Sequence, residues 1–462
     1  MKNMTLKNIA AAVGGELYAE KKDEERVVDA VEIDSRLIGK NGLFIATVGE
    51  RVDGHSFIDD VFSKGAAAVI SEKKLDDPKG PYIKVRSSFE ALEKLAAFYR
   101  QQISVKVVGI TGSVGKTSTK EVVASVLSQK YKCLKTEGNL NNNVGLPLMV
   151  LRIRDEEVAV LEMGISHFGE MTRLSESARP DIAIITNIGT SHMENLGSRE
   201  GIFEEKSHIT DFLAPDGLVI VNGDDDILGG MDEVNGHKVV KFGRGDKADV
   251  RLTEERSLGL EGNEFVIEGR LPGGRIKAAA SLVGYHMVIN AACAALTANE
   301  LGLTADEIIK GIASVKAISG RSNVIKTDNL TIIDDCYNAN PDSMRAAIKT
   351  AALAKGRKVL ILGDMFELGE TEHKLHREVG SFIASEESDE VITIGNLAKE
   401  IAEGAKENGV KNVHYFETKE DFRKEEDKLI KNGDTVLVKA SHGMHFEEIV
   451  EELKERGKKA AE

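Results

Sequence analysis

Short runs of consecutive apolar residues recur along the central and C-terminal parts of the chain, and segments with helical spacing separate them. Strands buried on both faces of a parallel sheet have such continuous apolar runs, and helices covering the sheet connect them. The alternation therefore predicts an α/β protein. The central runs are 107–110, 158–161, 182–185 and 218–221, and the C-terminal ones are 330–333, 359–362, 391–394 and 436–438.

Other segments depart from this alternation. Residues 1 to about 100 mix short strands and helices, and between about 236 and 280 short alternating runs with Gly-rich turns predict β-hairpins. The stretch 278–299 carries no charge and is long enough to suggest a membrane span. It contains Ser281, His286 and Asn290, however, so we predict a buried helix.

These shifts in pattern predict three domains, which is also what a chain of 462 residues suggests at about 150 residues per domain. We expect a small α/β module at 1–100, a central parallel-sheet domain at 101–317 and a C-terminal α/β domain at 318–462. No Gly-x-Gly-x-x-Gly follows any predicted strand, so the sequence offers no dinucleotide-binding fingerprint.

A glycine-rich turn, Thr111-Gly-Ser-Val-Gly-Lys-Thr117, joins the first central strand to a predicted helix. A helix N-terminus offers unpaired N–H groups and a positive dipole end, so a turn without bulk lets phosphates approach it. Lys116 would add a charge for the β/γ-phosphates, and Thr117 a hydroxyl for Mg²⁺. The match is to the short form Thr-Gly-x-x-Gly-Lys-Thr, because position 110 is isoleucine. The predicted ATP-phosphate residues are Gly112, Ser113, Gly115, Lys116, Thr117 and Ser118.

Polar side chains follow several predicted strands, at the sheet edge where ligands of open α/β sheets lie. A single carboxylate there is often only a helix cap. Glu162 gains weight because it lies in the same section as the phosphate turn, and Mg²⁺ prefers few protein oxygens. For His192, coordination of Mg²⁺ and hydrogen bonding to phosphate or water are both open. The Asn-rich turn 138–145 suits polar recognition, although it could be a plain loop.

Composition narrows the class of protein. The 41% hydrophobic and 30% charged residues are globular values, and the net charge of −15 argues against nucleic acid or an anionic membrane as partner. The N-terminus lacks the apolar core of a signal peptide. Cys133, Cys293 and Cys336 have no metal-type spacing and are expected to be free thiols. We therefore expect a cytoplasmic enzyme with no transmembrane segment.

Taken together, the motifs resemble one family, the ATP-dependent Mur ligases of peptidoglycan synthesis, and within it the branch that adds D-Ala-D-Ala. The resemblance runs nearly end to end. It rests on Asp34-Ser-Arg36, Asp53-Gly-His55, the turn 111–117, Gly138-Asn-Leu-Asn-Asn142, Glu162-Met-Gly164, Thr186 to His192, Glu205-Lys206, Gly284-Tyr-His286 with Asn290, Asp334 to Pro341 and Leu362 to Gly369.

The resemblance implies roles for single residues. Lys116 would contact the ATP phosphates, Thr117, Glu162 and His192 would hold Mg²⁺, and Lys206 would be a carbamate that bridges a second Mg²⁺. An ordinary helix lysine paired with Glu204 or Glu205 is the alternative for Lys206. The family further implies Asn290 and Asp335 at the adenosine, Arg321 at the phosphates, and substrate contacts from Ser35, Arg36, His55, Asn139, Asn141, Asn142, Asn338 and Asn340.

The implied architecture is a UDP-sugar module, a central P-loop ATPase domain and a C-terminal Rossmann-like domain. The implied cofactors are ATP and Mg²⁺, and the implied substrates are a UDP-MurNAc-tripeptide and D-Ala-D-Ala, bound by a monomer. Two departures stand out. The family's Lys-Gly-Ser-Arg is Lys439-Ala-Ser-His442 here, which removes a guanidinium. Val114 replaces a frequent asparagine, so position 114 is expected to contribute only its N–H.

Two other functions are compatible with parts of the sequence. Another ligase of the same superfamily, such as a different Mur ligase or folylpolyglutamate synthase, would share the central motifs. The folate enzyme would not need the UDP-sugar motifs at Asp34 and Asp53. A nucleotide-switched binding protein would need the phosphate turn, but not Glu162, His192 and Lys206 together.

Overall fold

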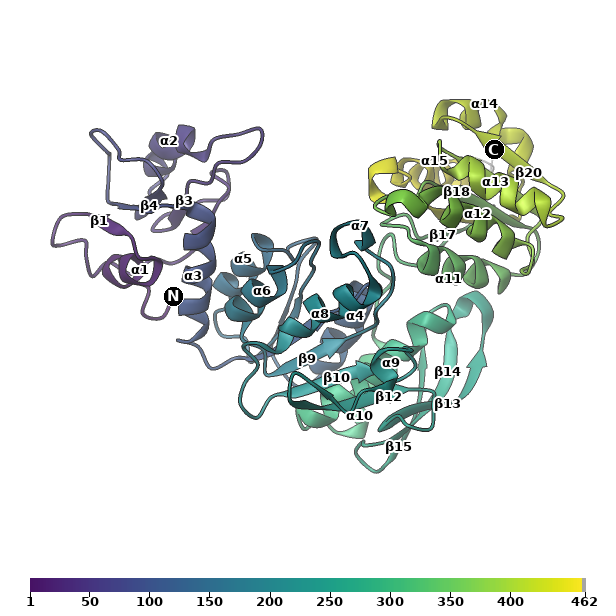
Figure 1. Ribbon diagram of the computed structural model, residues 1–462, viewed down its shortest axis with the longest axis horizontal. Helices are drawn as coiled ribbons and strands as arrows, with labels where there is room; N and C mark the ends of the chain where they lie inside the picture. The colour runs from purple at the N-terminus through teal and green to yellow at the C-terminus, as the bar shows by residue number, and fades with distance from the viewer. Residues whose placement is uncertain (459–462) are drawn as a thin grey trace.

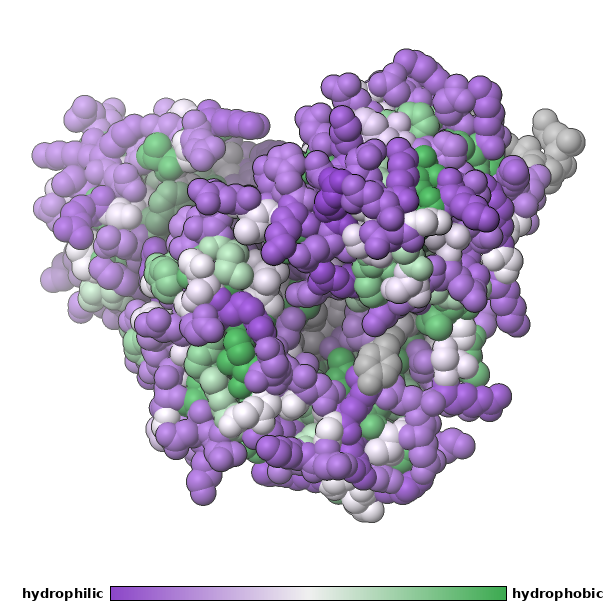
Figure 2. Space-filling model, turned by 45° about the vertical axis from the view of Figure 1, so that its right-hand side comes forward, coloured by the Kyte–Doolittle hydropathy of each residue, from purple (hydrophilic) through white to green (hydrophobic). Residues whose placement is uncertain are grey.

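The computed structural model describes residues 1–458, and three β-sheets follow one another along this part of the chain. In Figure 1 the N-terminal and C-terminal domains stand apart on either side of the central one, and the space between them opens toward the top. Figure 2 shows a mostly hydrophilic face that is hollowed near its middle. The expected three-domain α/β class is confirmed.

The N-terminal domain is built on a five-stranded sheet of order β1-β5-β4-β3-β2, in which only the β1–β5 pair is antiparallel. Its elements are α1 (Leu6–Val13), β1 (Glu16–Tyr18), β2 (Val31–Glu32), β3 (Leu43–Ile45), η1 (Gly54–Phe57), α2 (Ile58–Ser63), β4 (Ala68–Ser71), β5 (Tyr82–Lys84) and α3 (Ser88–Arg100).

Helix α3 fixes this domain to the central one. Ser87 caps its N-terminus by accepting a hydrogen bond from the Glu90 N–H, and its buried residues recur at helical spacing. At its end the Tyr99 hydroxyl donates to the Ile153 carbonyl over 2.6 Å. Arg100 donates to the carbonyl of Ala178 over 2.8 Å. The helix thus joins the two domains by buried contacts.

The central sheet has ten strands, and β15-β14-β13-β12-β10-β9-β6-β8-β7 is its main path. Pairing is parallel from β7 to β13 and antiparallel from β13 to β15. Its strands are β6 (Lys106–Thr111), β7 (Cys133–Lys135), β8 (Val158–Glu162), β9 (Ile182–Ile185), β10 (Leu218–Asn222), β11 (Glu233–Val234), β12 (His237–Gly243), β13 (Val250–Ser257), β14 (Asn263–Gly269) and β15 (Arg275–Ala280).

Helices cover both faces of this sheet, as continuous apolar strands require. Val107 packs into one core with α5, α6 and α8, and Val108 into the opposite core with α4, α9 and α10. The helices are α4 (Lys116–Leu127), α5 (Gly145–Arg152), α6 (Glu170–Ala178), α7 (Met193–Leu196), α8 (Arg199–Ser207), η2 (His208–Thr210), η3 (Leu228–Gly230), η4 (Gly259–Glu261), α9 (Tyr285–Glu300) and α10 (Ala305–Ala313).

The C-terminal sheet has the order β16-β17-β21-β18-β19-β20 and is parallel except for β16 at its edge. Its elements are β16 (Asn323–Lys326), β17 (Thr331–Asp334), α11 (Pro341–Ala352), β18 (Lys358–Gly363), η5 (Gly369–Thr371), α12 (Glu372–Ile383), β19 (Glu390–Ile394), α13 (Ala398–Glu407), β20 (Val413–Phe416), α14 (Lys419–Leu429), β21 (Thr435–Lys439), η6 (His442–Met444) and α15 (Glu447–Lys458).

All eight predicted strands are present. In the region predicted to form β-hairpins, β13, β14 and β15 pair antiparallel, whereas β12 pairs parallel with β10 and β13. The helix predicted at 278–299 was wrong at its start, because residues up to Ala280 belong to β15 and α9 begins at Tyr285. Ala278 and Ala280 pair with β14 and are both buried, with the exposed Ala279 between them, which is the alternation of a strand. An uncharged composition alone does not separate a strand from a helix. Within residues 1–458, no helix combines the length and apolar character needed to cross a membrane.

Candidate functional site

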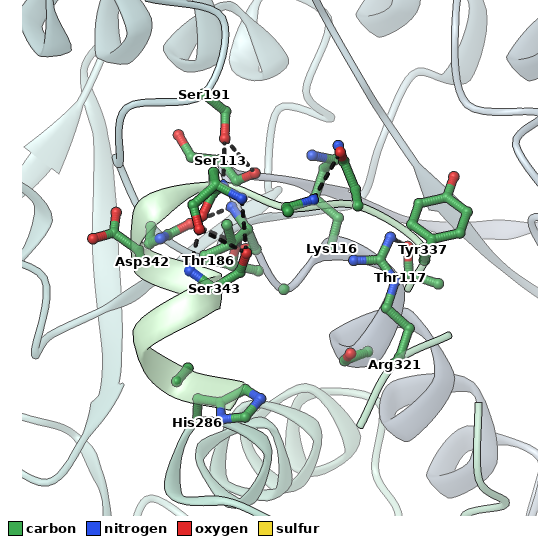
Figure 3. A pocket seen from close by; sticks show the side chains of 18 of the residues that line it. Ser113, Lys116, Thr117, Thr186, Ser191, His286, Arg321, Tyr337, Asp342 and Ser343 are labelled. Atoms are coloured by element: carbon green, nitrogen blue, oxygen red, sulfur yellow. Dashed lines mark hydrogen bonds between the residues drawn. The ribbon is translucent and has the colours of Figure 1, made fainter. Parts of the chain in front are cut away.

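A cleft of about 630 Å³ lies where the central and C-terminal domains face each other. The phosphate turn and the ends of β8, β9 and β10 form its central side, and residues between β17 and α11 form the opposite side. Figure 3 shows Lys116 and Thr117 beside Arg321 and Tyr337. Of the predicted residues, Ser113, Gly115, Lys116, Thr117, Ser118, Asn141, Asn142, Glu162, His192, Asn290, Arg321, Asp335, Asn338 and Asn340 line this cleft.

Two glycines shape the phosphate turn. Gly112 has φ +148°, and a Cβ there would lie 1.9 Å from the Thr186 hydroxyl oxygen, so no larger residue fits. Gly115 has a left-handed φ of +84° and immediately precedes α4. The turn therefore closes tightly onto the end of β9 and leads directly into a helix N-terminus.

The end of β9 holds the turn through a set of hydrogen bonds. The Thr186 hydroxyl donates to the Val114 carbonyl over 2.7 Å. The Val114 N–H donates to Asn187 Oδ1 over 2.9 Å, so this N–H is not free for a phosphate here. The Ser113 hydroxyl accepts from the Gly189 N–H over 2.9 Å. Asn187 and Gly189 thus hold the turn in place. Both lie in the motif from Thr186 to His192, but the sequence did not predict this role for them.

Lys116 folds back over its own turn, and its Nζ donates to the Gly112 carbonyl over 2.8 Å. Burial lowers the pKa of this ammonium, Glu162 opposes that change, and Arg321 adds to it. The Lys116 ammonium thus lies at the N-terminus of α4, near Glu162 and Arg321, where phosphate oxygens would meet it.

Glu162 is buried at the end of β8, and its hydrogen-bond donors among residues 1–458 are neutral. The Thr117 hydroxyl lies 3.0 and 3.2 Å from its two carboxylate oxygens, and Asn141 Nδ2 donates to Oε1 over 2.9 Å. No ion pair to Glu162 exists among residues 1–458. A buried carboxylate without a cationic partner is unfavourable. The hydroxyl and the carboxylate together fit Mg²⁺, which takes few protein oxygens and keeps waters.

Lys206 lies in α8 and is almost fully buried, with 1% of its surface exposed. Neither Glu204 nor Glu205 pairs with it; Glu205 instead accepts the N–H groups of Gly169 and Met171 over 2.8 and 2.7 Å. Burial holds the pKa of Lys206 well below its usual range, and the charge of Lys116 lowers it further. The alternative of an ordinary helix lysine paired with Glu204 or Glu205 is therefore not what the structure shows for Lys206.

His192 lines the cleft with an unusual backbone, at a left-handed φ of +63° just before α7. Such strain in a residue other than glycine is more frequent at functional sites. Its Nδ1 lies 2.9 Å from Glu367 of the C-terminal domain, and this proximity lowers the pKa of that carboxyl. The alignment is not that of a hydrogen bond, and Nδ1 has no hydrogen-bond partner among residues 1–458.

Asn290 and Asp335 face the cleft from opposite domains. The Thr119 hydroxyl donates to Asn290 Oδ1 over 3.0 Å, and the amide nitrogen of Asn290 donates no hydrogen bond within residues 1–458. Asp335 accepts from the Ser322 N–H over 2.8 Å and pairs with Lys439 Nζ at 2.6 Å. Lys439 comes from the altered Lys439-Ala-Ser-His442 motif, in which Ala440 is buried and His442 is exposed.

Arg321 crosses from the start of the C-terminal domain to the phosphate turn. Its Nη2 donates to Thr117 Oγ1 over 3.3 Å, and its guanidinium carbon lies 4.0 Å from the centre of the Tyr337 ring. Arg321 Nε is buried and has no acceptor within the described residues 1–458, as expected of a group that binds an anion. Tyr337 lies in the motif from Asp334 to Pro341, but the sequence predicted no role for this residue.

The predicted asparagines have mixed local roles. Asn142 Oδ1 accepts the N–H groups of Val144 and Gly145 at the start of α5. Asn340 caps α11 and also donates to Ser191 Oγ over 2.9 Å. Asn338 Oδ1 accepts the Ala339 N–H over 2.9 Å. Asn139 is exposed and accepts from the Tyr337 hydroxyl, outside the cleft lining.

The predicted residues of the N-terminal domain do not line this cleft. Arg36 is exposed and pairs with Asp34 at 2.6 Å, which lowers the pKa of Asp34 to about 2. The Ser35 carbonyl accepts from Lys64 over 2.8 Å. His55 is more enclosed: Nε2 accepts the Glu72 N–H over 3.1 Å, and Nδ1 lies 2.6 Å from Asp53. Both ring nitrogens of His55 are thus engaged within the domain.

Comparisons with known proteins agree along the whole chain. Residues 27–100 match the Mur ligase family catalytic domain, residues 110–298 the Mur ligase middle domain, and residues 320–442 the Mur ligase glutamate ligase domain. The UDP-N-acetylmuramoyl-tripeptide–D-alanyl-D-alanine ligase of Bacillus subtilis is 41% identical over 97% of this chain and 98% of its own.

Solved structures give the same result. MurF from Acinetobacter baumannii superposes with a TM-score of 0.88 at 33% identity, covering 98% of each chain. MurF ligase from Thermotoga maritima in complex with ADP has a TM-score of 0.83 at 31% identity, covering 93% of this chain and 98% of its own.

Proposed function

The chain belongs to the Mur ligase family, and we propose that it joins D-Ala-D-Ala to the C-terminal carboxylate of a UDP-MurNAc-tripeptide with hydrolysis of ATP. The product is the UDP-MurNAc-pentapeptide used for peptidoglycan. One observation carries the proposal: the phosphate turn, the buried Glu162 and residues of the C-terminal domain meet in one cleft. Full-length similarity to ligases of this specificity supports the choice of substrates.

The chemistry requires two steps. A carboxylate oxygen of the tripeptide attacks the γ-phosphorus, and the bond from phosphorus to ADP breaks, which leaves an acyl phosphate. The amine of D-Ala-D-Ala then attacks the carbonyl carbon, the carbon–oxygen bond breaks, and phosphate departs as the amine loses its proton. No protein nucleophile is needed, so the three free cysteines require no catalytic role.

The residues of the chain supply position and charge. Lys116 and the N–H groups at the start of α4 would stabilise charge on the transferring phosphoryl group. Arg321 would neutralise phosphate oxygens from the other side, because its Nε has no acceptor in the part of the chain that the structure describes. Asn290 and Asp335 would hold the adenosine. Facing domains also exclude water, from which an acyl phosphate must be protected.

A divalent cation fits the remaining groups. Thr117, Glu162 and His192 would hold Mg²⁺, which when bound neutralises charge on the phosphates. Lys206 would act as a carbamate holding a second ion. The proposal for Lys206 rests on the family match and is supported by its burial and the absence of an ion-pair partner among residues 1–458. A neutral amine is the form that reacts with CO₂.

The N-terminal domain would hold the UDP end of the substrate through Ser35 and Arg36, because a guanidinium contacts phosphate oxygens in pairs. His55 would stabilise the loop around Asp53, whereas Asn139, Asn141, Asn142, Asn338 and Asn340 would border the peptide. We also propose that the enzyme acts as a monomer in the cytoplasm, where its nucleotide substrates are made.

Phosphate release with omission of single substrates tests the function. The full reaction should need ATP, the UDP-tripeptide and D-Ala-D-Ala, and should give a pentapeptide product detectable by mass. Dependence on a folate and glutamate would instead favour folylpolyglutamate synthase. Nucleotide binding without ligation would favour a switch protein. Running L-lysine and meso-diaminopimelate tripeptides side by side would identify the third residue.

A further inference from the structure

A closed ring of contacts surrounds the mouth of the phosphate turn. Arg321 donates to Thr117, whose hydroxyl donates to Glu162 over 3.0 Å. Asn141 donates to the same carboxylate over 2.9 Å, and its own N–H donates to the Asn139 carbonyl over 2.8 Å. The Tyr337 hydroxyl donates to Asn139 Oδ1, and the aromatic side chain of Tyr337 stacks on Arg321. This last contact completes the ring of contacts. Figure 3 shows its Thr117, Arg321 and Tyr337 members together.

The Asn-rich turn 138–145 carries two members of this ring, Asn139 and Asn141, and backbone hydrogen bonds and close packing hold it in place. The Gly164 N–H donates to the Asn141 carbonyl over 2.8 Å, and the Leu140 N–H donates to the backbone carbonyl of Glu137 over 3.1 Å. Gly145 packs so closely that a Cβ there would lie 2.4 Å from Leu140 Cα. Because these contacts hold Asn139 and Asn141 in one compact turn, we expect a displacement of Asn139 to displace Asn141 as well.

The turn also joins two domains. Tyr337 lies between β17 and α11 of the C-terminal domain, whereas Glu162 ends β8 of the central one. Asn141 fixes one carboxylate oxygen of Glu162 while the Thr117 hydroxyl contacts the other more closely. The orientation of the carboxylate therefore depends on the place of Asn141, and the place of Asn139 depends on the docking of Tyr337.

We propose that the Asn-rich turn transmits the position of the C-terminal domain to Glu162, with Tyr337 and Asn141 as positioning residues for the cation site. This inference rests on the proposed function, because it assumes that Glu162 holds the cation that accompanies ATP. Docking of Tyr337 presents Glu162 in its cation-binding orientation. The cation is then bound well only when the two domains face each other.

The test measures binding of a non-hydrolysable ATP analogue to the full chain by calorimetry, at a series of Mg²⁺ concentrations. Tyr337→Phe keeps the ring over Arg321 and removes only the hydroxyl, and Asn141→Ala removes the amide. Each should raise the half-saturating Mg²⁺ concentration by roughly tenfold, the effect of losing a hydrogen bond to a charged or coupled group. Analogue binding without Mg²⁺ should not change.

The double variant decides whether the effect is transmitted. If Tyr337 acts through Asn141, the double variant should need no more Mg²⁺ than Asn141→Ala alone. Additive shifts, or no shift in Tyr337→Phe, would overturn the proposal. Asn412→Ala is the matched control, because the side-chain amide of Asn412 donates a 2.9 Å hydrogen bond to the backbone carbonyl of Asp389 on the surface. A wild-type chain whose analogue binding ignored Mg²⁺ would refute the proposed function itself, whereas Mg²⁺-dependent wild-type binding with unshifted variants would refute only the transmission.

Discussion

The ammonium group of Lys116 lies 2.8 Å from the carbonyl oxygen of Gly112, four residues earlier in the same turn. This hydrogen bond holds the charge over the turn before any nucleotide arrives, so little reorganisation is needed on binding. Preorganised charge of this kind contributes most when the transition state forms.

Lys116→Ala should therefore leave the fold intact and slow ligation by about 10²–10³-fold. Circular dichroism and a kcat measurement at saturating ATP would check both points. Lys130→Ala is a matched control, because Lys130 also donates to a glycine carbonyl, at Gly302, but on the exposed surface. A folded Lys116→Ala enzyme with near wild-type kcat would remove Lys116 from the reaction.

Lys206→Ala should be inactive and should recover part of its activity when short carboxylates such as formate or acetate are added. The added carboxylate would replace the carbamate in the space that the side chain leaves. Lys241→Ala removes another largely buried lysine of the same domain, and it should show no such rescue. Full activity of Lys206→Ala without additive would rule out the carbamate.

Arg36→Ala should raise KM for the UDP-tripeptide several-fold while KM for ATP stays nearly constant. Its kcat should fall less than that of Lys116→Ala, because the lost contact is made equally in ground and transition states. Stability should hardly change, since the pair with Asp34 is exposed. Lys22→Ala, which removes another exposed pair in this domain, serves as control. A defect in ATP binding would mean that the first domain binds a different substrate.

The burial of His376 leads us to predict that the free energy of unfolding depends on pH. It is fully buried, accepts the Met365 N–H at Nε2 over 2.8 Å and has Nδ1 2.7 Å from the Glu372 carbonyl. Burial lowers its pKa, and the Glu372 contact and the Asp364 charge only partly oppose this. The unfolded chain then binds the proton more readily, so stability falls as pH drops below the unfolded value of about 6.5.

Urea unfolding between pH 7 and pH 5 would measure this effect. His376→Gln should flatten the pH slope, by at most about 1.4 kcal/mol per pH unit for one proton. His373→Gln, an exposed histidine of the same helix, should leave the slope unchanged. Equal slopes in wild type and His376→Gln would show that protonation of His376 does not limit stability at low pH.

The sequence was most informative where local chemistry determines structure. Gly112 and Gly115 identify the turn, because a Cβ at Gly112 would clash with Thr186 and Gly115 has a left-handed φ of +84°. The helix at 278–299 was placed too early, since an uncharged run does not say whether it pairs with β14 or packs as a helix.

Contacts between residues far apart in the chain could not be predicted from the sequence. Asn187 contacts Val114 across 73 positions, Tyr337 contacts Asn139 across 198, and Arg321 reaches Thr117 across 204. Tyr337 lies in the motif from Asp334 to Pro341, but only the fold shows that it faces Arg321. The family roles of the site residues remain predictions that the variants above test.

The central claim is that the tripeptide carboxylate is activated by phosphorylation, and isotope transfer tests it most directly. The UDP-tripeptide is labelled with ¹⁸O in its C-terminal carboxylate and incubated with the wild-type enzyme, ATP, Mg²⁺ and D-Ala-D-Ala, and the released phosphate is analysed by mass spectrometry. Our account predicts one ¹⁸O in each phosphate, because the oxygen that attacks phosphorus leaves with it. Pentapeptide formation with unlabelled phosphate would contradict the account.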